Sequence, residues 1–196
     1  MNLALFDFDN TIASCDTWTR FMRLAVRPSR LVAGRALLIP VVVGYRLGLV
    51  SASNGRQIAM RIGLQGEKAA RVRELGIEYA TMVLPTLLQP PALERIDGHK
   101  AQGDRIVVVS ASLDMYLNPW CKTMGVDVIC SQLEEKAGRL TGRYVRGDCT
   151  GTEKVNRIRE RYNLTQYERI YAYGDSDEDR EMLDLAHEKY YRWKKA

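Results

Sequence analysis

The stretch Leu3-Ala-Leu-Phe-Asp-Phe-Asp-Asn-Thr11 decides the fold of this 196-residue chain. Its four apolar residues, Leu3 to Phe6, run directly into two carboxylates, Asp7 and Asp9. A short apolar run bounded by a turn signal predicts a central parallel strand that is buried on both faces. Two acids at the end of such a strand repel each other unless a cation or a bound ligand compensates their charge. The pattern therefore favours chemistry at this point over a simple polar turn.

The second half of the chain is expected to alternate strands with helices. We expect strands at 105–110, 127–130, 169–173 and 189–193, helices at 93–102, 115–124, 153–162 and 179–186, and a β-hairpin within 132–145. Such alternation predicts an α/β fold with a doubly wound, Rossmann-like parallel sheet.

The segment 14–88 is expected to be all-helical. Asp16 can cap a first helix that stops before Pro28, and a second helix is expected to bend or break around Pro40. Ser51-Ala-Ser53 offers the N-cap of a third helix. Residues 67–88 form a longer amphipathic helix, with Val72, Leu75, Tyr79, Met82 and Val83 expected on one side. The chain therefore divides into an α/β core, residues 1–13 and 89–196, and a helical insertion, residues 14–88.

The basic residues are unevenly distributed. The window from Thr17 to Gly66 holds eight of the 29 Lys and Arg residues and none of the 24 acidic ones, so it carries +8 while the rest carries −3. This asymmetry indicates either a solvated basic face or an anionic partner, such as a phosphorylated substrate or an acidic membrane surface. Nucleic acid is not favoured, because the window has no recognisable nucleic-acid motif and few aromatic residues.

The cysteines and the apolar runs bear on localisation. Four widely spaced cysteines without a C-x-x-C pair favour a reducing cytoplasm, and no secretory signal pattern opens the sequence. The most apolar stretch, residues 36–45, is shorter than the roughly 20 residues of a membrane span. The alternative to a purely cytoplasmic protein is peripheral contact with the inner face of a membrane, through aliphatic residues beside Arg30, Arg35 and Arg46. The sequence leaves the oligomeric state open.

Three further stretches follow expected strands or open a helix. Ser110, with Ala111, ends the strand 105–110. Gly174-Asp-Ser-Asp-Glu-Asp179 follows the strand 169–173, and Lys154 lies near the start of a helix. Ligands of open α/β sheets bind outside the carboxyl ends of the strands. A hydroxyl, a lysine and several carboxylates gathered there suit a phosphate group and a hard cation such as Mg²⁺.

The order of these four motifs resembles that of the haloacid dehalogenase superfamily: Asp7-Phe-Asp-Asn-Thr11, then Ser110, Lys154 and the 174–179 motif. The insertion is similar to the helical type 1 cap of its phosphoserine phosphatase-like members. The resemblance implies Mg²⁺-dependent hydrolysis of a phosphate monoester through an aspartyl-phosphate intermediate.

The resemblance also implies a role for each residue. Asp7 is the nucleophile and Asp9 the general acid and base. The remaining roles are Mg²⁺ binding by the Asp7 side chain, the Asp9 carbonyl oxygen and Asp175; phosphate binding by Ser110, Ala111 and Lys154; bracing of the loop by Thr11; and support of the metal or of Lys154 by Asp179.

The substrate is less defined than the chemistry. Asp16 stands where phosphoserine-type members usually have Glu, and Arg56 or Arg61 could bind a substrate carboxylate. Phosphoserine or another small phosphomonoester is expected. Open alternatives are a lipid-phosphate phosphatase of the phosphatidylglycerophosphatase type at a membrane surface, a phosphotransferase, and a non-enzymatic module that binds anions or nucleic acid.

Overall fold

Six strands form the sheet at the centre of the molecule, in the order β3-β2-β1-β6-β7-β8. A computed structural model describes the backbone of residues 1–196 and all side chains except those of Ala33 and Arg35. The strands are β1 (Leu3–Phe6), β2 (Arg105–Leu113), β3 (Asp127–Ser131), β6 (Ile170–Gly174), β7 (Glu188–Tyr191) and β8 (Lys194–Lys195). All neighbouring strands are parallel except β7 and β8. The order reverses at β1, so the doubly wound α/β prediction is confirmed.

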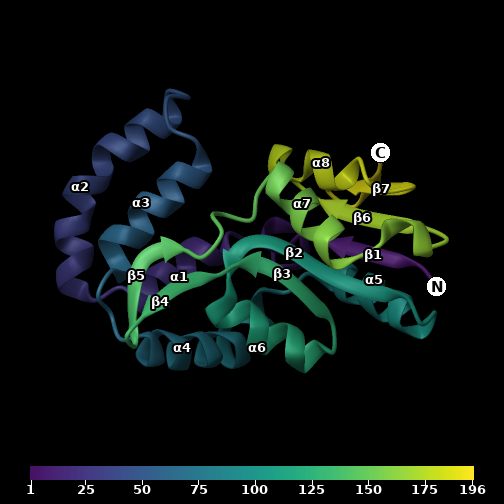
Figure 1. Cartoon of the computed structure of the whole chain (residues 1–196), viewed down its shortest axis with the longest axis horizontal. Coiled ribbons are helices and arrows are strands. Elements are labelled where there is room, and N and C mark those ends of the chain that lie inside the picture. Colours follow the sequence, from purple (N-terminus) through teal and green to yellow (C-terminus); the bar gives the residue numbers. More distant parts are fainter.

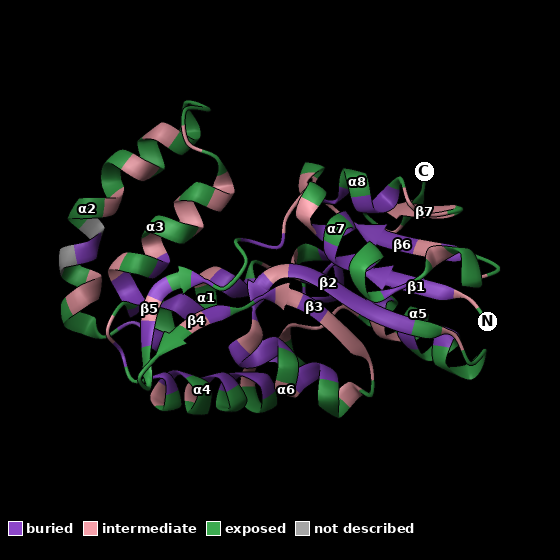
Figure 2. Cartoon of the chain, viewed as in Figure 1, coloured by how far each residue is buried: buried purple, intermediate pink, exposed green. Residues whose placement is uncertain are grey.

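Strand β1 is buried on both faces, as its unbroken apolar sequence predicts (Figure 2). Ala4 and Phe6 belong to one hydrophobic cluster, whereas Leu3 and Leu5 belong to another on the opposite face. Helices α5 (Pro90–Ala101) and α6 (Asp114–Met124) contribute to the first cluster, while α7 (Thr152–Arg161) and α8 (Arg180–Leu183) contribute to the second. The strand end that carries Asp7 is thereby fixed between two layers.

Helices α1 to α4 form the part of the molecule beside the sheet, on the left of Figure 1. They are α1 (Thr17–Ala25), α2 (Pro28–Arg46), α3 (Ala52–Leu64) and α4 (Ala69–Glu78), followed by a π-helix (Tyr79–Val83) and a 3₁₀-helix (Leu84–Leu87). Asp16 caps α1 by accepting from the Thr19 amide at 2.8 Å, and Ser51 caps α3 by accepting from the Asn54 amide at 3.2 Å. Both capping predictions are confirmed.

Of two further expectations for this helical segment, the bend at Pro40 is met and the position of Met82 is not. Helix α2 continues through Pro40, which is exposed, so water can satisfy the carbonyl that loses its partner; Figure 1 shows the helix curving instead of breaking. The prediction that Met82 lies on the buried side is wrong, because its side chain is 70% exposed. The π-helix that begins at Tyr79 shifts the register of the following residues and turns Met82 outward.

The expected β-hairpin is confirmed as β4 (Leu133–Lys136) and β5 (Arg139–Tyr144), paired antiparallel. It lies against the helical segment. The Leu140 amide donates to the Glu67 carbonyl at 2.9 Å, and the Gly66 amide donates to the Leu140 carbonyl at 2.8 Å. The part of the molecule beside the sheet is therefore built from helices α1 to α4 and this hairpin together.

Among the described helices, none, α2 included, is both long and apolar enough to cross a membrane.

Candidate active site

Lys154 joins two carboxylates at the carboxyl ends of the strands. Its Nζ donates to Oδ1 of Asp7 at 2.6 Å and to Oδ1 of Asp179 at 2.5 Å. Lys154 is only 2% exposed, and Asp7 and Asp179 are also buried. The Asp7 amide still donates to the Tyr173 carbonyl at 2.9 Å, so sheet pairing with β6 continues to this residue. The backbone thus holds Asp7 rigidly beside its cation.

Burial sets the electrostatics of this cluster. Burial, followed by the nearby charge of Asp179, raises the pKa of Asp7 well above its ordinary value, although Lys154 opposes the shift. Burial would also raise the pKa of Asp179, but Lys154 and the hydrogen bonds from Ser176 hold that pKa below its ordinary value. Burial opposes the charge of Lys154 too, yet its two carboxylate partners keep the pKa of its ammonium raised. One lysine does not neutralise the acids around it.

The loop after β6 adds a further carboxylate. Burial and the charge of Asp179 raise the pKa of Asp175 to about 6. One carboxylate oxygen from each of Asp7, Asp175 and Asp179 lies within 4.8 Å of the others. Carboxylate oxygens at this spacing, with charge left uncompensated, fit a hard divalent cation. Asp179 uses both of its oxygens, since Oδ2 accepts from the Asp175 and Ser176 amides at 3.1 Å, so Asp7 and Asp175 are the freer ligands.

Asp9 is held by residues that the sequence analysis did not identify. Thr17 donates to Oδ1 of Asp9 through its hydroxyl and, at 2.8 Å, through its amide. The Ser112 hydroxyl donates to Oδ2 of Asp9 at 2.6 Å, and Tyr116 donates to Ser112 at 2.6 Å. Burial raises the pKa of Asp9, although the hydrogen bonds from Ser112 and Thr17 oppose the shift. Ser112 stands two residues after Ser110 on the same strand, and this spacing was the signal that could have found it.

The remaining predicted residues of the core lie close to Asp7. Ser110, which is buried, and Ala111 line the same cavity as Asp7 and Lys154. The Thr11 hydroxyl is buried without a hydrogen-bond partner among the described atoms. Gln89 instead braces the loop, because its Nε2 donates to the carbonyls of residues 10, 11 and 13 at 2.9–3.1 Å. Sequence reasoning missed Gln89, whose position 78 residues after Thr11 gives no local signal.

The helical segment closes one side of a cavity of about 460 Å³. Its wall there consists of Asp16, Trp18, Thr19, Tyr45 and Arg56, while Asp7, Ser110, Lys154 and Asp175 lie on the sheet side. The cavity therefore joins carboxylates and a lysine to two aromatic side chains.

Arg56 and Arg61 have different positions. Arg56 Nε donates to Oδ2 of Asp148 at 2.8 Å, and its Nη2 donates to Glu178 at 3.1 Å. Arg56 thus ties α3 to the loops around the site. Arg61 does not line this cavity; it lies beside Gly142 of the hairpin and lines another one. Two residues that lie five positions apart on an α-helix point in clearly different directions, which explains why Arg56 and Arg61 line different cavities.

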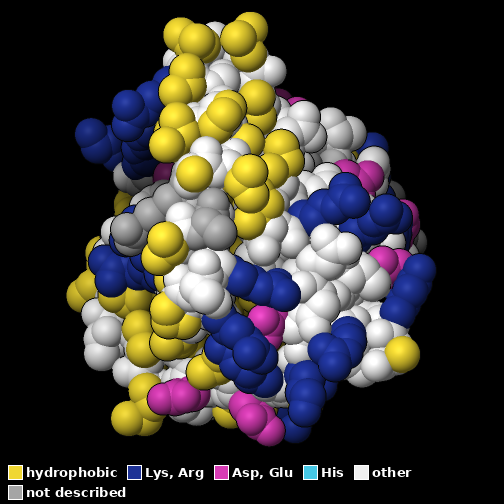
Figure 3. Space-filling model, turned by 90° about the vertical axis from the view of Figure 1, so that its left-hand side faces the viewer, with side chains coloured by type: hydrophobic (Ala, Val, Ile, Leu, Met, Phe, Trp, Pro, Cys, Tyr) yellow, Lys and Arg dark blue, Asp and Glu magenta, His cyan; other side chains and the backbone are white. Residues whose placement is uncertain are grey.

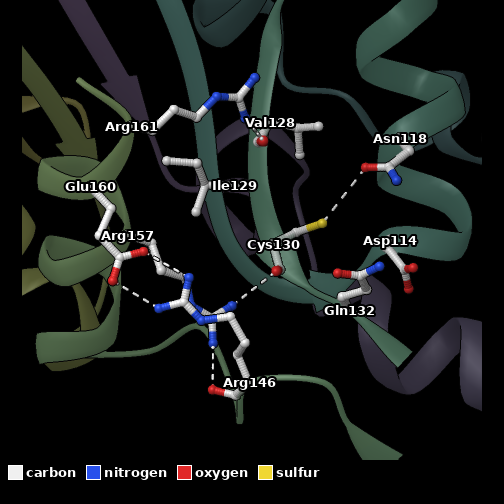
Figure 4. A pocket seen from close by; sticks show the side chains of 10 residues that line it. All are labelled: Asp114, Asn118, Val128, Ile129, Cys130, Gln132, Arg146, Arg157, Glu160 and Arg161. Atoms are coloured by element: carbon white, nitrogen blue, oxygen red, sulfur yellow. Dashed lines mark hydrogen bonds and ion pairs between the residues drawn. The ribbon is translucent and has the colours of Figure 1, made fainter. Parts of the chain in front are cut away.

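A second cavity, of about 480 Å³, lies beside β3 at the sheet edge (Figure 4). Arg161 Nη1 donates to the Val128 carbonyl at 2.6 Å, and Arg157 Nη1 donates to the Cys130 carbonyl at 3.0 Å. Side-chain donors therefore occupy carbonyls that an edge strand would otherwise offer to another chain. Arg157 and Arg161 thus protect the sheet edge, and the cavity that they line is separate from the site around Asp7.

Comparison with known proteins agrees with this geometry. The sequence matches the haloacid dehalogenase-like hydrolase family over residues 4–184, and the chain belongs to that family. It is 31% identical to Protein CicA of Caulobacter vibrioides, over 97% of this chain and 85% of that protein. It is 26% identical to a histidinol-phosphatase of Neisseria meningitidis, over 95% of this chain and 88% of that protein.

The fold is also that of a solved phosphoserine phosphatase, captured as an analogue of its phospho-aspartyl intermediate. The TM-score is 0.68 at 21% identity, over 97% of this chain and 85% of the other. The predicted resemblance is therefore confirmed, and so is the prediction of a phosphatase of the haloacid dehalogenase type.

Proposed function

We propose that this chain hydrolyses a phosphate monoester with Mg²⁺, through a phosphoryl group carried on Asp7. The observation that carries the proposal is the buried contact of Asp7 with Lys154 at 2.6 Å, at the end of the central strand and beside Asp175. An anionic nucleophile fixed next to a cation can approach a negatively charged phosphate without prohibitive repulsion.

In the first step, an oxygen of Asp7 attacks phosphorus and the bond from phosphorus to the leaving alkoxide breaks. Asp9 gives a proton to that alkoxide, and the raised pKa of Asp9 supports this role as an acid. In the second step, water attacks phosphorus and gives its proton to Asp9, which frees Asp7 and inorganic phosphate. Thr17 and Ser112 would keep Asp9 in position for both transfers.

The other residues would stabilise charge on the phosphoryl group. Ser110, the Ala111 backbone and Lys154 are assigned to its oxygens, since all three line the cavity. Asp7, the Asp9 carbonyl and Asp175 are assigned as ligands of Mg²⁺. A bound Mg²⁺ supplies positive charge between the nucleophile and the phosphate.

The segment 14–88 is assigned as the cap over the site, and the core as residues 1–13 and 89–196. Small phosphomonoesters are the expected substrates, with phosphoserine first to be tried because the fold is that of phosphoserine phosphatases. Asp16 and Arg56 lie in the cavity wall, where they could meet the amine and the carboxylate of an amino-acid ester. Arg61 is no longer proposed as a contact, because it lines a different cavity. The reaction is assigned to the cytoplasm.

A lipid phosphate is a second candidate substrate, favoured by one observation. An apolar cavity of about 170 Å³ shares Trp18 and Thr19 with the wall of the site. Most of its other lining side chains are apolar: Met22 of α1, Val26 directly after α1, Leu31 and Leu38 of α2, and Ala59 and Ile62 of α3. Arg23 and Arg30 line it as well. A hydrocarbon tail beside a bound phosphate would fit this arrangement.

The test compares hydrolysis of an aryl phosphate by the parent and by Asp7→Asn, with Mg²⁺ and with a chelator. We expect release of phosphate only by the parent with Mg²⁺, and equal rates for both proteins would refute the nucleophile assignment. The same assay with phosphoserine and with phosphatidylglycerophosphate then compares the two substrate classes.

A phosphotransferase would share the first step and differ in the second. Adding a simple alcohol and analysing the products separates the two, because a transferase would yield a new phosphate ester in place of inorganic phosphate. The non-enzymatic alternatives have lost their support, since the chain belongs to a hydrolase family.

A further inference from the structure

Helix α2 and the turn that follows it expose hydrophobic side chains, all aliphatic except Tyr45, in a continuous band, which we name the α2 surface. Its members are Val32, Leu37, Ile39, Val42, Val43, Tyr45, Leu47 and Leu49, each 48–80% exposed. In Figure 3 hydrophobic side chains form this band across the face of the molecule, with Lys and Arg side chains on both flanks. Soluble monomers seldom leave so large an apolar area in water, so this surface indicates a binding partner.

The apolar character of α2 is not required by its packing on α3. The contact between these helices is close, since a Cβ at Gly34 would lie 3.1 Å from the Ile62 side chain of α3. The turn that follows α2 also packs against it, since a Cβ at Gly44 would lie 2.8 Å from the Val50 side chain. These contacts use one side of the helix. A surface helix normally places polar residues on its other side, whereas α2 has aliphatic residues there as well.

The charge of the segment restricts the choice of partner. No Asp or Glu occurs from residue 17 to residue 66, while eight arginines do. Arg23, Arg46 and Arg61 are exposed, and Arg27 and Arg30 lie within 3.0–3.7 Å of Glu67. Arg35, expected to contribute to this face, lies outside the described side chains. The partner must therefore combine an apolar interior with negative charge at its surface.

We propose that the α2 surface docks on an anionic lipid bilayer, with its aliphatic side chains among the acyl chains and its arginines among the headgroups. Basic residues beside an exposed apolar helix face are typical of interfacial binding. A second copy of the chain is a poorer partner, because a symmetric contact would bring two segments of the same positive charge together. The surface also offers few of the aromatic anchors common at protein interfaces.

Docking would bring the active-site cavity to the headgroup layer. Tyr45 belongs to the α2 surface and also lines the cavity that contains Asp7. The mouth of the cavity and the docking surface thus share one side chain at the end of α2. The inference does not depend on the proposed reaction, since binding to vesicles requires no catalysis.

The test is co-sedimentation of the whole chain with vesicles of phosphatidylcholine, with and without phosphatidylglycerol. We expect binding only to vesicles with phosphatidylglycerol, weakening as salt is added. The double variant Leu37→Gln, Val43→Gln should bind about tenfold more weakly or worse, because two inserted aliphatic side chains are lost. Met82→Gln is the matched control: Met82 is 70% exposed but lies outside the α2 surface, and this variant should bind like the parent.

Each other outcome overturns the proposal. The parent could remain in the supernatant with phosphatidylglycerol vesicles at low salt, or the double variant could bind as well as the parent. If sedimentation velocity showed a dimeric parent and a monomeric double variant, and the double variant kept its vesicle binding, the α2 surface would be an interface between copies. Asp7→Asn should bind vesicles like the parent, so failure of the proposed reaction would leave this result unaffected. All variants except Asp7→Asn should hydrolyse a soluble aryl phosphate at the parent rate.

Discussion

The active-site cluster around Asp7 and the α2 surface differ in opposite ways from an ordinary soluble domain. Around Asp7, three ionisable side chains (Asp7, Lys154 and Asp179) are buried, and Lys154 is 2% exposed. On the α2 surface, aliphatic side chains are exposed, and Leu49 is 80% exposed. Buried charge and exposed apolar area both lower the stability of a folded chain. These two regions are therefore shaped by what they bind, whereas β1 and its two hydrophobic layers are shaped by folding.

Removing the buried ammonium group of Lys154 should have the largest effect on the stability of the folded chain. Lys154→Met leaves Asp7 and Asp179 buried without their partner, so the free energy of unfolding should fall by about 3–5 kcal/mol. Urea unfolding without added metal measures this. Lys136→Met is the control, because the Lys136 side chain is 74% exposed and its loss should cost less than about 1 kcal/mol. Similar losses for both variants would contradict a buried, functional cation.

Arg56 ties α3 to the loops around the site and should give the next largest effect. Arg56→Gln removes the partner of Asp148, whose side chain is 2% exposed, so we expect a loss of about 2 kcal/mol. Hydrolysis should slow as well, since α3 would no longer be tied over the site. Arg61→Gln, five residues away and exposed, should change stability by less than about 0.5 kcal/mol. An equal effect of the two substitutions would show that the Arg56 contacts matter little.

Asp114 lies outside both regions and makes the stability of the folded chain depend on pH. Burial raises its pKa to about 6, so the folded chain binds its proton more tightly than the unfolded chain does. This group therefore lowers stability as pH rises from about 4 to about 6, and the cost remains above that range. Asp114→Asn should add about 1 kcal/mol at pH 7 and nothing near pH 4. The Leu133 amide keeps an acceptor in Asn, and an equal gain at both pH values would exclude titration of Asp114 as the cause.

The smallest effect on stability is expected on the α2 surface. The variant Leu37→Gln, Val43→Gln should change the free energy of unfolding by less than about 0.5 kcal/mol, because Leu37 and Val43 are 61% and 50% exposed. Leu64→Ala in α3, where the side chain is fully buried, should cost about 2–5 kcal/mol. A large loss in the double variant would mean that the α2 surface serves folding, and the contrast between the regions would disappear.

Much of the fold could be predicted because its signals are local. The apolar run before Asp7 and the alternation of strands and helices predicted the doubly wound sheet, and the capping residues Asp16 and Ser51 marked two helix starts correctly. The strand-end rule also predicted that Ser110 and Asp175 would meet Asp7, and the structure brings them to one cavity.

What could not be predicted depends on contacts between distant segments. Thr17 and Ser112 hold Asp9 from 8 and 103 residues away, and no periodicity encodes such a meeting. The choice between Arg56 and Arg61 required knowing which side of α3 faces the core. Met82 was misplaced because a π-helix changes the helical register without any clear sequence signal.

Trapping the intermediate shows directly whether Asp7 carries the phosphoryl group. Borohydride added during turnover of an aryl phosphate reduces an acyl phosphate to an alcohol, which would convert Asp7 into homoserine. Peptide mass spectrometry should then find homoserine at residue 7, only when both substrate and Mg²⁺ are present. Homoserine at residue 9, or none at either residue while phosphate is released at the full rate, would contradict the assignment of Asp7 as the nucleophile.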